Sequence, residues 1–266
     1  MPSPADLTLY APDLIHDPNP PRLRPTVSVC PGGAYRYTSD REAEPVALAL
    51  LARGLNVYVL RYHCAPEASW PIPQLELALA IHTARQEAEE LRARPDGLFL
   101  LGFSAGGHLA ASLGILWRKS GWAETLGFHP EEIRPDGMVL CYPVITSGEK
   151  AHQGSFDNLL GVRRAELNQI ASLETQVTAD TVPAFLWHTR DDGSVPVENS
   201  LLLASALAGH GIPFELHIWP HGVHGLALAN ELTAASGEPS QLQPDCTAWL
   251  DLACAWITSF TTPILC

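Results

Sequence analysis

The chain has 266 residues, and its charged side chains sum to −13 at pH 7. This acidic balance argues against a nucleic-acid binder, because such a protein needs a basic face that neutralises phosphates, and it argues equally against docking on anionic lipid. Hydrophobic residues make up 46% and charged residues only 17% of the chain, which excludes a disordered protein and is enough for a large core.

The start of the chain and its cysteines point to a reducing compartment. Residues 1–10 show no basic region followed by an apolar one, so we expect no signal peptide, and no apolar run approaches the roughly 20 residues that span a bilayer. The six cysteines form no CxxC pair, and Cys30 and Cys141 stand inside apolar runs. We therefore expect free thiols, a cytoplasmic location, no zinc site and no cofactor.

Short apolar runs recur along the chain and alternate with longer helical patterns. The runs are rich in Val, Leu, Ile or aromatic residues and most are flanked by Gly or Pro, which is typical of buried strands. In chain order, the predicted strands are an edge strand at 6–10 and buried strands at 26–30, 56–62, 97–103, 137–144, 184–188 and 214–219.

Helical patterns lie between these strands, with apolar residues every three or four positions in segments 43–54, 77–91 and 249–260. The alternation predicts a three-layer α/β fold, in which helices cover both faces of a mostly parallel central sheet. Segment 146–181 departs from the pattern, because it is polar and shows only a short helical piece near 164–170. We expect a single domain over residues 1–266, with 146–181 either an active-site wall or lid, or a plain solvent-facing connection.

The sequence GFSAG at residues 102–106 is the sharpest motif. It stands directly after the predicted strand at 97–103 and directly before a helical run at 108–117. That context is typical of a nucleophile elbow, a tight strand-to-helix turn that projects a serine hydroxyl at the carboxyl end of a strand. Ser104 is therefore the predicted nucleophile, and His108 is expected to pack under the elbow.

A serine needs a base and an orienting acid, which follow it along the chain in this kind of site. The strand at 184–188 leads into TRDDGSVP at 189–196, where two aspartates compete. The pattern D-x-x-V-P selects Asp192 as the acid, three residues before Val195. Asp191 is then expected to be a turn residue.

The base is expected after the strand at 214–219, in the segment PHGVHG at 220–225. His224, which precedes a glycine in a loop, is the predicted base, and His221 is the alternative. Together with His217 these histidines resemble a metal site superficially. No thiolate or carboxylate completes a ligand set in this segment, so we expect no metal.

A glycine-rich loop, PGGAY at residues 31–35, follows the strand that ends at Cys30. Backbone N–H groups of Gly33 and Ala34 are predicted to join that of Ala105 in an oxyanion hole. The alternative is an ordinary strand-to-helix turn. Cys30 lacks a base of its own, so we interpret it as a core residue.

Taken together, these motifs resemble the α/β-hydrolase superfamily, and more narrowly the small bacterial esterases similar to acetylxylan and feruloyl esterases. The resemblance covers most of residues 27–229. Its segments are PGGAY, RYHCAPEASWP, GFSAGGHLAASLG, CYPVITSG, the block from SLETQ to LASAL, and ELHIWPHGVHGLAL. The chain departs from the family's HGGG-type loop at Pro31 and Ala34, and the backbone N–H groups of the loop survive either change.

The resemblance implies a serine carboxylesterase that hydrolyses short-chain acyl esters through Ser104, His224 and Asp192 and an acyl-enzyme. Among acyl groups acetyl is favoured, because the sequence indicates no long apolar lid and a cytoplasmic location is expected. Acetyl esters of carbohydrates are the hypothesis for the substrate, with deacetylation of xylo- or manno-oligosaccharides as the reaction. One alternative is an amidase or peptidase with the same three residues, including an arylformamidase-like hydrolase. Another is a catalytically silent homologue, although no member of the triad is missing here.

Aromatic side chains are the predicted sugar contacts, because their faces stack on pyranose rings. Tyr35 and Trp70 are the main candidates, with Tyr37 and Trp122 beside them; all four could instead be ordinary core or surface aromatics. The expected partner is a small-molecule or oligosaccharide ester, with no nucleic acid and no membrane. The net charge of −13 fits a neutral ester better than a phosphorylated one, and the sequence is compatible with a homodimer.

Overall fold

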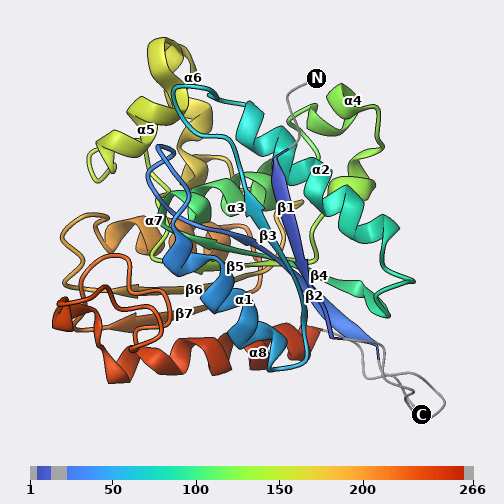
Figure 1. Cartoon of the computed structure of the whole chain (residues 1–266). Coiled ribbons are helices and arrows are strands. Elements are labelled where there is room, and N and C mark those ends of the chain that lie inside the picture. The colour runs from blue at the N-terminus through green and yellow to red at the C-terminus, as the bar shows by residue number, and fades with distance from the viewer. Residues whose placement is uncertain (1–4, 13–22, 261–266) are drawn as a thin grey trace.

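A single seven-stranded sheet forms the centre of the molecule (Figure 1). The structure is a computed structural model and describes residues 5–12 and 23–260. The strands are β1 (Asp6–Tyr10), β2 (Arg24–Cys30), β3 (Asn56–Arg61), β4 (Ala93–Phe103), β5 (Gly137–Cys141), β6 (Ala184–Thr189) and β7 (Phe214–Trp219). Their order is β1-β3-β2-β4-β5-β6-β7, and only β1 runs antiparallel to its neighbour.

The strands confirm the predicted fold class, and only β4 and β5 differ from the predicted bounds by more than two residues. β1 and β7 begin and end where the apolar runs do. β5 ends at Cys141 rather than at residue 144, because Tyr142 has a φ of 38° and turns the backbone out of the sheet. β4 begins at Ala93 because its polar first residues also lie against β2, where Ala93 is paired with Arg24.

Helices cover both faces of the sheet, as predicted (Figure 1). They are α1 (Glu44–Leu51), α2 (Ile72–Gln86), α3 (Ser104–Leu116), α4 (Trp122–Leu126), α5 (Gln153–Leu160), α6 (Arg164–Ala171), α7 (Glu198–Gly209) and α8 (Trp249–Phe260). Side chains alternate along β4. Phe99 and Leu101 pack into the core with α1 and α8, and Leu98 and Leu100 pack into the core with α2 and α3.

One predicted helix is displaced along the chain. The apolar pattern placed a helix at 77–91, whereas α2 spans Ile72–Gln86. It begins earlier because Pro73 fits the first turn, where no backbone donor is needed. Residues 87–92 form turns, and Arg92 has a φ of 47°, a left-handed conformation that a helix cannot contain.

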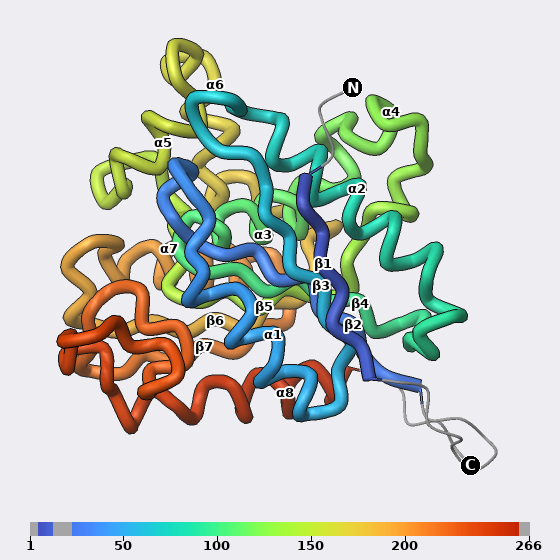
Figure 2. The backbone as a smooth tube through the Cα atoms, in the orientation of Figure 1, coloured from blue at the N-terminus to red at the C-terminus, as the bar shows by residue number. Residues whose placement is uncertain are grey.

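Segment 146–181 holds two helices, α5 and α6, where the sequence indicated only the second. Figure 2 shows the segment on the side of the sheet that carries α3 and α7. The His152 ring caps α5, because its Nδ1 accepts a hydrogen bond from the backbone N–H of Ser155 at 3.3 Å. An imidazole is an unusual cap, which explains why the start of α5 carried no recognisable signal.

The structure bears on the expected absence of membrane-spanning segments and on the expected free thiols. None of the helices in residues 5–12 and 23–260 is long and apolar enough to cross a bilayer. Free thiols were expected, and the described cysteines are free: Cys30, Cys64, Cys141, Cys246 and Cys254. Cys266 lies outside the described residues. Burial raises the pKa of the Cys30 thiol, which fits its place in the core.

Candidate active site

Ser104 stands at the turn between β4 and α3, where the sequence predicts a nucleophile elbow. Its φ of 51° is the strained left-handed conformation that such a turn imposes on the serine. Gly106, two residues on, lets α3 lie against the loop that follows β2. A Cβ at that position would overlap the carbonyl oxygens of Cys30 and Pro31. The elbow is thus packed directly against the glycine-rich loop.

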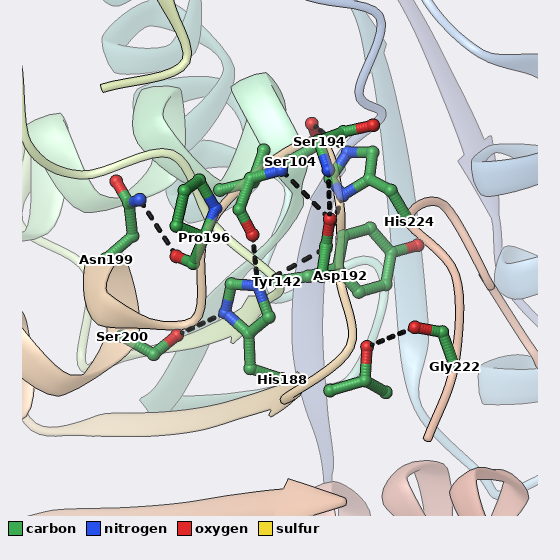
Figure 3. Close-up of polar contacts among 12 residues, drawn as sticks. Ser104, Tyr142, His188, Asp192, Ser194, Pro196, Asn199, Ser200, Gly222 and His224 are labelled. Atoms are coloured by element: carbon green, nitrogen blue, oxygen red, sulfur yellow. Dashed lines mark hydrogen bonds and ion pairs between the residues drawn. The ribbon is translucent and has the colours of Figure 1, made fainter. Parts of the chain in front are cut away.

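The three predicted catalytic side chains form one hydrogen-bonded chain (Figure 3). Ser104 Oγ lies 2.8 Å from His224 Nε2, and His224 Nδ1 lies 2.6 Å from Asp192 Oδ2. Because the carboxylate accepts a hydrogen bond from the Nδ1–H group, Nε2 is left as the acceptor for the serine hydroxyl. The serine and the aspartate are each 7% exposed, so the chain is shielded from water along most of its length.

Asp192 is held in one orientation by its own loop. Its Oδ1 accepts the backbone N–H groups of Ser194 and Val195, both at 2.9 Å. Burial alone would raise the pKa of Asp192, but hydrogen bonds from His188, His224 and Val195 hold that pKa below its usual value. The carboxylate therefore stays ionised and faces the imidazole.

His188 is a buried contributor that the sequence did not reveal. It lies near the end of β6 with its side chain fully buried, and its Nε2 is 3.0 Å from the Val195 carbonyl and 3.3 Å from Asp192 Oδ2. Its Nδ1 lies 2.8 Å from Ser200 Oγ (Figure 3). A lone histidine in an apolar strand gives no sequence signal of this contact, because the acid loop folds back onto it only in three dimensions.

The alternatives considered for acid and base pair with each other. His221 Nδ1 lies 2.7 Å from Asp191 Oδ2, and the two side chains are 75% and 43% exposed. His217 pairs on β7 with Glu215, at 2.6 Å. The three histidines of this segment therefore have three different carboxylate partners, and only His224 reaches Ser104.

The glycine-rich loop presents backbone donors beside Ser104. Gly33 has a φ of 128° and Ala34 a φ of 54°, and both line the same cavity as the serine. Across residues 5–12 and 23–260, no hydrogen bond takes up the N–H groups of Gly33, Ala34 or Ala105. The N–H of Gly32 is excluded as an oxyanion donor, because it binds Glu42 Oε2 at 2.8 Å.

The cavity over Ser104 is small and mostly polar, with a volume of about 260 Å³. Its lining is Gly33, Ala34, Tyr37, Ser39, Arg41, Glu42, Ser104, His152, Ser194, His224 and Gly225. His152 comes from segment 146–181, so that segment forms part of the cavity wall. Asn158, in the same segment, connects this wall to the glycine-rich loop, because its side-chain amide donates a hydrogen bond to the Ala34 carbonyl at 2.8 Å.

The aromatic residues predicted at the rim are mostly placed elsewhere. Tyr35 is 1% and Trp70 6% exposed, and neither lines the cavity. The Tyr35 hydroxyl is used by His108, 2.8 Å away at Nδ1, under the elbow as expected for that histidine. These positions correct the predicted substrate contacts of Tyr35 and Trp70. Tyr37, 61% exposed, is the aromatic side chain at the cavity.

A mostly parallel sheet with a strained serine elbow at the carboxyl end of β4, and a histidine and an aspartate from the loops after β7 and β6, is the architecture of an α/β hydrolase. Residues 13–207 match the BD-FAE family, and the chain belongs to that family. Its homologues support an α/β hydrolase that is similar to carbohydrate esterases.

Two curated relatives match 78% of this chain. One is endo-1,4-beta-xylanase B of Butyrivibrio fibrisolvens, 37% identical, and the other is the acetylxylan esterase of Xylanibacter ruminicola, 29% identical. The chain spans only 33% of the first and 42% of the second.

Solved structures match over nearly the whole chain. The acetyl ester-xyloside bifunctional hydrolase of Caldicellulosiruptor lactoaceticus is 39% identical with a TM-score of 0.79, over 97% of this chain and 89% of that one. The carboxylesterase Cest-2923 of Lactobacillus plantarum is 29% identical with a TM-score of 0.84, over 95% and 92%.

Proposed function

We propose that the protein is a serine carboxylesterase that removes short acyl groups, acetyl above all, from carbohydrate esters. The observation that carries the proposal is the hydrogen-bonded chain from Ser104 through His224 to Asp192 at the elbow. Relatives named as esterases support the ester bond as the target. Relatives named for acetylxylan and for an acetyl ester-xyloside hydrolase support an acetylated sugar.

The proposed reaction is acyl transfer to water. Ser104 Oγ attacks the ester carbonyl while His224 Nε2 takes its proton, and Asp192 stabilises the imidazolium that forms. The carbonyl oxygen becomes an oxyanion, which N–H groups of Ala105 and of Gly33 or Ala34 would bind. The ester C–O bond then breaks, and the alcohol leaves with the proton from His224. Water attacks the acyl-serine in the same way and releases the carboxylic acid.

The lining of the cavity favours a small acyl group and a polar alcohol. A volume of about 260 Å³ lies below the usual range for drug-sized ligands. His152 adds a donor for a hydroxyl group: its Nδ1 accepts the Ser155 N–H, so the neutral ring carries its proton on Nε2. Burial, helped by the nearby His224, lowers the pKa of His152 and favours that neutral ring.

A panel of substrates tests the proposal. We expect hydrolysis of 4-nitrophenyl acetate that falls with butyrate and octanoate, and faster hydrolysis of acetylated xylo- or manno-oligosaccharides than of the plain aryl acetate. Ser104→Ala should lower kcat by about 10⁴-fold or more. Activity of that variant within tenfold of the native protein would refute the nucleophile, and equal rates on sugar and aryl acetates would refute the carbohydrate preference. Faster cleavage of the matching anilide or formanilide would favour the amidase alternative.

A further inference from the structure

A second carboxylate lies beside the candidate triad and takes no part in the reaction proposed above. Glu42 ends the short turn η1 (Asp40–Glu42) before α1, is 4% exposed and lines the cavity over Ser104. Its two oxygens have different partners: Oε2 accepts the Gly32 N–H at 2.8 Å, and Oε1 accepts the Tyr142 hydroxyl at 2.7 Å. A buried carboxylate is costly unless its oxygens are hydrogen-bonded, so its presence here calls for a role.

Tyr142 extends the connection to the loop of the candidate base. Its hydroxyl oxygen accepts the backbone N–H of Ala227 at 2.8 Å, three residues after His224. Its ring also packs edge-on against the His224 ring, with centroids 5.1 Å apart. Burial, together with the adjacent Glu42, raises the pKa of Tyr142, so the hydroxyl keeps the proton that it donates.

The same turn grips both loops by other bonds. Ser39, just before η1, donates its N–H to the Gly32 carbonyl at 2.9 Å. Arg41 donates to the Gly225 carbonyl at 3.0 Å and also to the Thr233 carbonyl. The turn therefore binds the oxyanion side and the histidine side of the cavity at once, although Gly225 lies 184 residues from Arg41 in the sequence.

We propose that Glu42 is a positioning residue that holds the Gly33 loop and the His224 loop at the correct distance from each other around Ser104. Only an acceptor-only group can serve both donors. A glutamine offers a single carbonyl oxygen, so its NH₂ group would face either the Gly32 N–H or the Tyr142 hydroxyl. This role rests on the proposed function, because it assigns the two loops to oxyanion binding and to the base.

The consequence is a loss confined to the tetrahedral state. When oxyanion donors move by a fraction of an ångström, the protein binds the tetrahedral transition state much less tightly, whereas its binding of the ester changes far less. Methylboronic acid tests this directly. Ser104 Oγ adds to boron while His224 Nε2 takes the hydroxyl proton, which gives a tetrahedral boronate anion, and no ester is required. Methylboronic acid is also small enough to enter the cavity whatever length of acyl group the protein accepts. Its dissociation constant and the kcat and KM for 4-nitrophenyl acetate form the readout.

Glu42→Gln is the test variant and Glu76→Gln the matched control. Glu76 is also 4% exposed and also accepts a backbone N–H, that of His63 at 2.9 Å, but it does not line the cavity. We expect Glu42→Gln to weaken boronate binding and to lower kcat by roughly tenfold to a hundredfold, with KM within about twofold. Glu76→Gln should leave all three within about twofold.

Unchanged boronate binding in Glu42→Gln, or an equal loss in Glu76→Gln, would overturn the proposal. If Glu42→Gln does not fold, Tyr142→Phe decides, because it keeps both the carboxylate and the ring: boronate binding weakened by several fold supports the role, and unchanged binding refutes it. A native protein that binds methylboronic acid but hydrolyses no ester refutes the proposed function alone. One that forms no adduct at Ser104 refutes both.

Discussion

Replacing Asp192 with asparagine should abolish activity without disturbing the fold, for a reason that follows from its hydrogen bonds. Oδ1 accepts two N–H groups, from Ser194 and Val195, at 2.9 Å each. In Asp192→Asn the amide oxygen must keep those two donors, so the NH₂ group faces His224. His224 Nδ1 then has to accept, and the ring proton moves to Nε2, where it points at Ser104 Oγ. The base can no longer take the serine proton.

The expected loss is about 10⁴-fold in kcat, the size found when an imidazole is held in the wrong tautomer. The measurement is hydrolysis of 4-nitrophenyl acetate at pH 7.5, with far-UV circular dichroism and thermal unfolding to show that the variant is folded. KM should change little, because His224 lines the cavity and Asp192 does not.

Asp191→Asn provides the matched control. The residue is adjacent, carries the same group and also pairs with a histidine, but that pair is at the surface. Surface ion pairs contribute little, so we expect kcat within about twofold of the native value. The reasoning is refuted if Asp192→Asn keeps more than a tenth of the native activity, or if the two variants rank in the opposite order.

Two further predictions concern stability. Gly106→Ala should lower the free energy of unfolding by about 3 kcal/mol or more in urea titrations, because the new Cβ overlaps two carbonyl oxygens, whereas Gly209→Ala, at a position open to solvent, should change it by less than about 1 kcal/mol. Burial lowers the pKa of His108 to about 4 from its usual 6.5. Between those two pH values the unfolded chain binds a proton at this histidine and the folded chain does not. The contribution of the neutral ring to the free energy of unfolding is therefore complete above about pH 6.5 and falls as the pH drops. The loss of stability from pH 7 to pH 5 should therefore be about 2 kcal/mol smaller in His108→Gln than in the native protein; equal losses would contradict the buried neutral imidazole.

The strands and the three residues of the candidate triad could be predicted from the sequence, because each is indicated by a local pattern of residues. β1 and β7 follow their apolar runs residue for residue. Ser104, Asp192 and His224 each stand just after a strand, and the carboxyl ends of parallel strands share one edge of a sheet, so their meeting is a topological consequence.

The residues that the sequence did not reveal depend on packing between distant segments. Glu42 lies in the polar stretch DREAE, where the sequence does not distinguish a buried glutamate from one exposed to solvent. His152 lies in a polar insertion whose first helix it caps itself. Tyr35 and Trp70 were expected at the rim because an aromatic side chain near a site looks the same in sequence whether it faces the cavity or the core. Tyr35 is buried because its hydroxyl finds His108.

The position of β7 at the end of the sheet has a consequence for how the protein fails on heating. β7 pairs with β6 alone among the described strands, and Phe214 and Ile218 on it are 38% and 40% exposed. The segment that follows this outermost strand carries His224. Fraying at an edge costs less free energy than melting the whole domain, so withdrawal of the base needs only a local opening. The elbow and the glycine-rich loop stand on inner strands and would still be formed when turnover has already stopped.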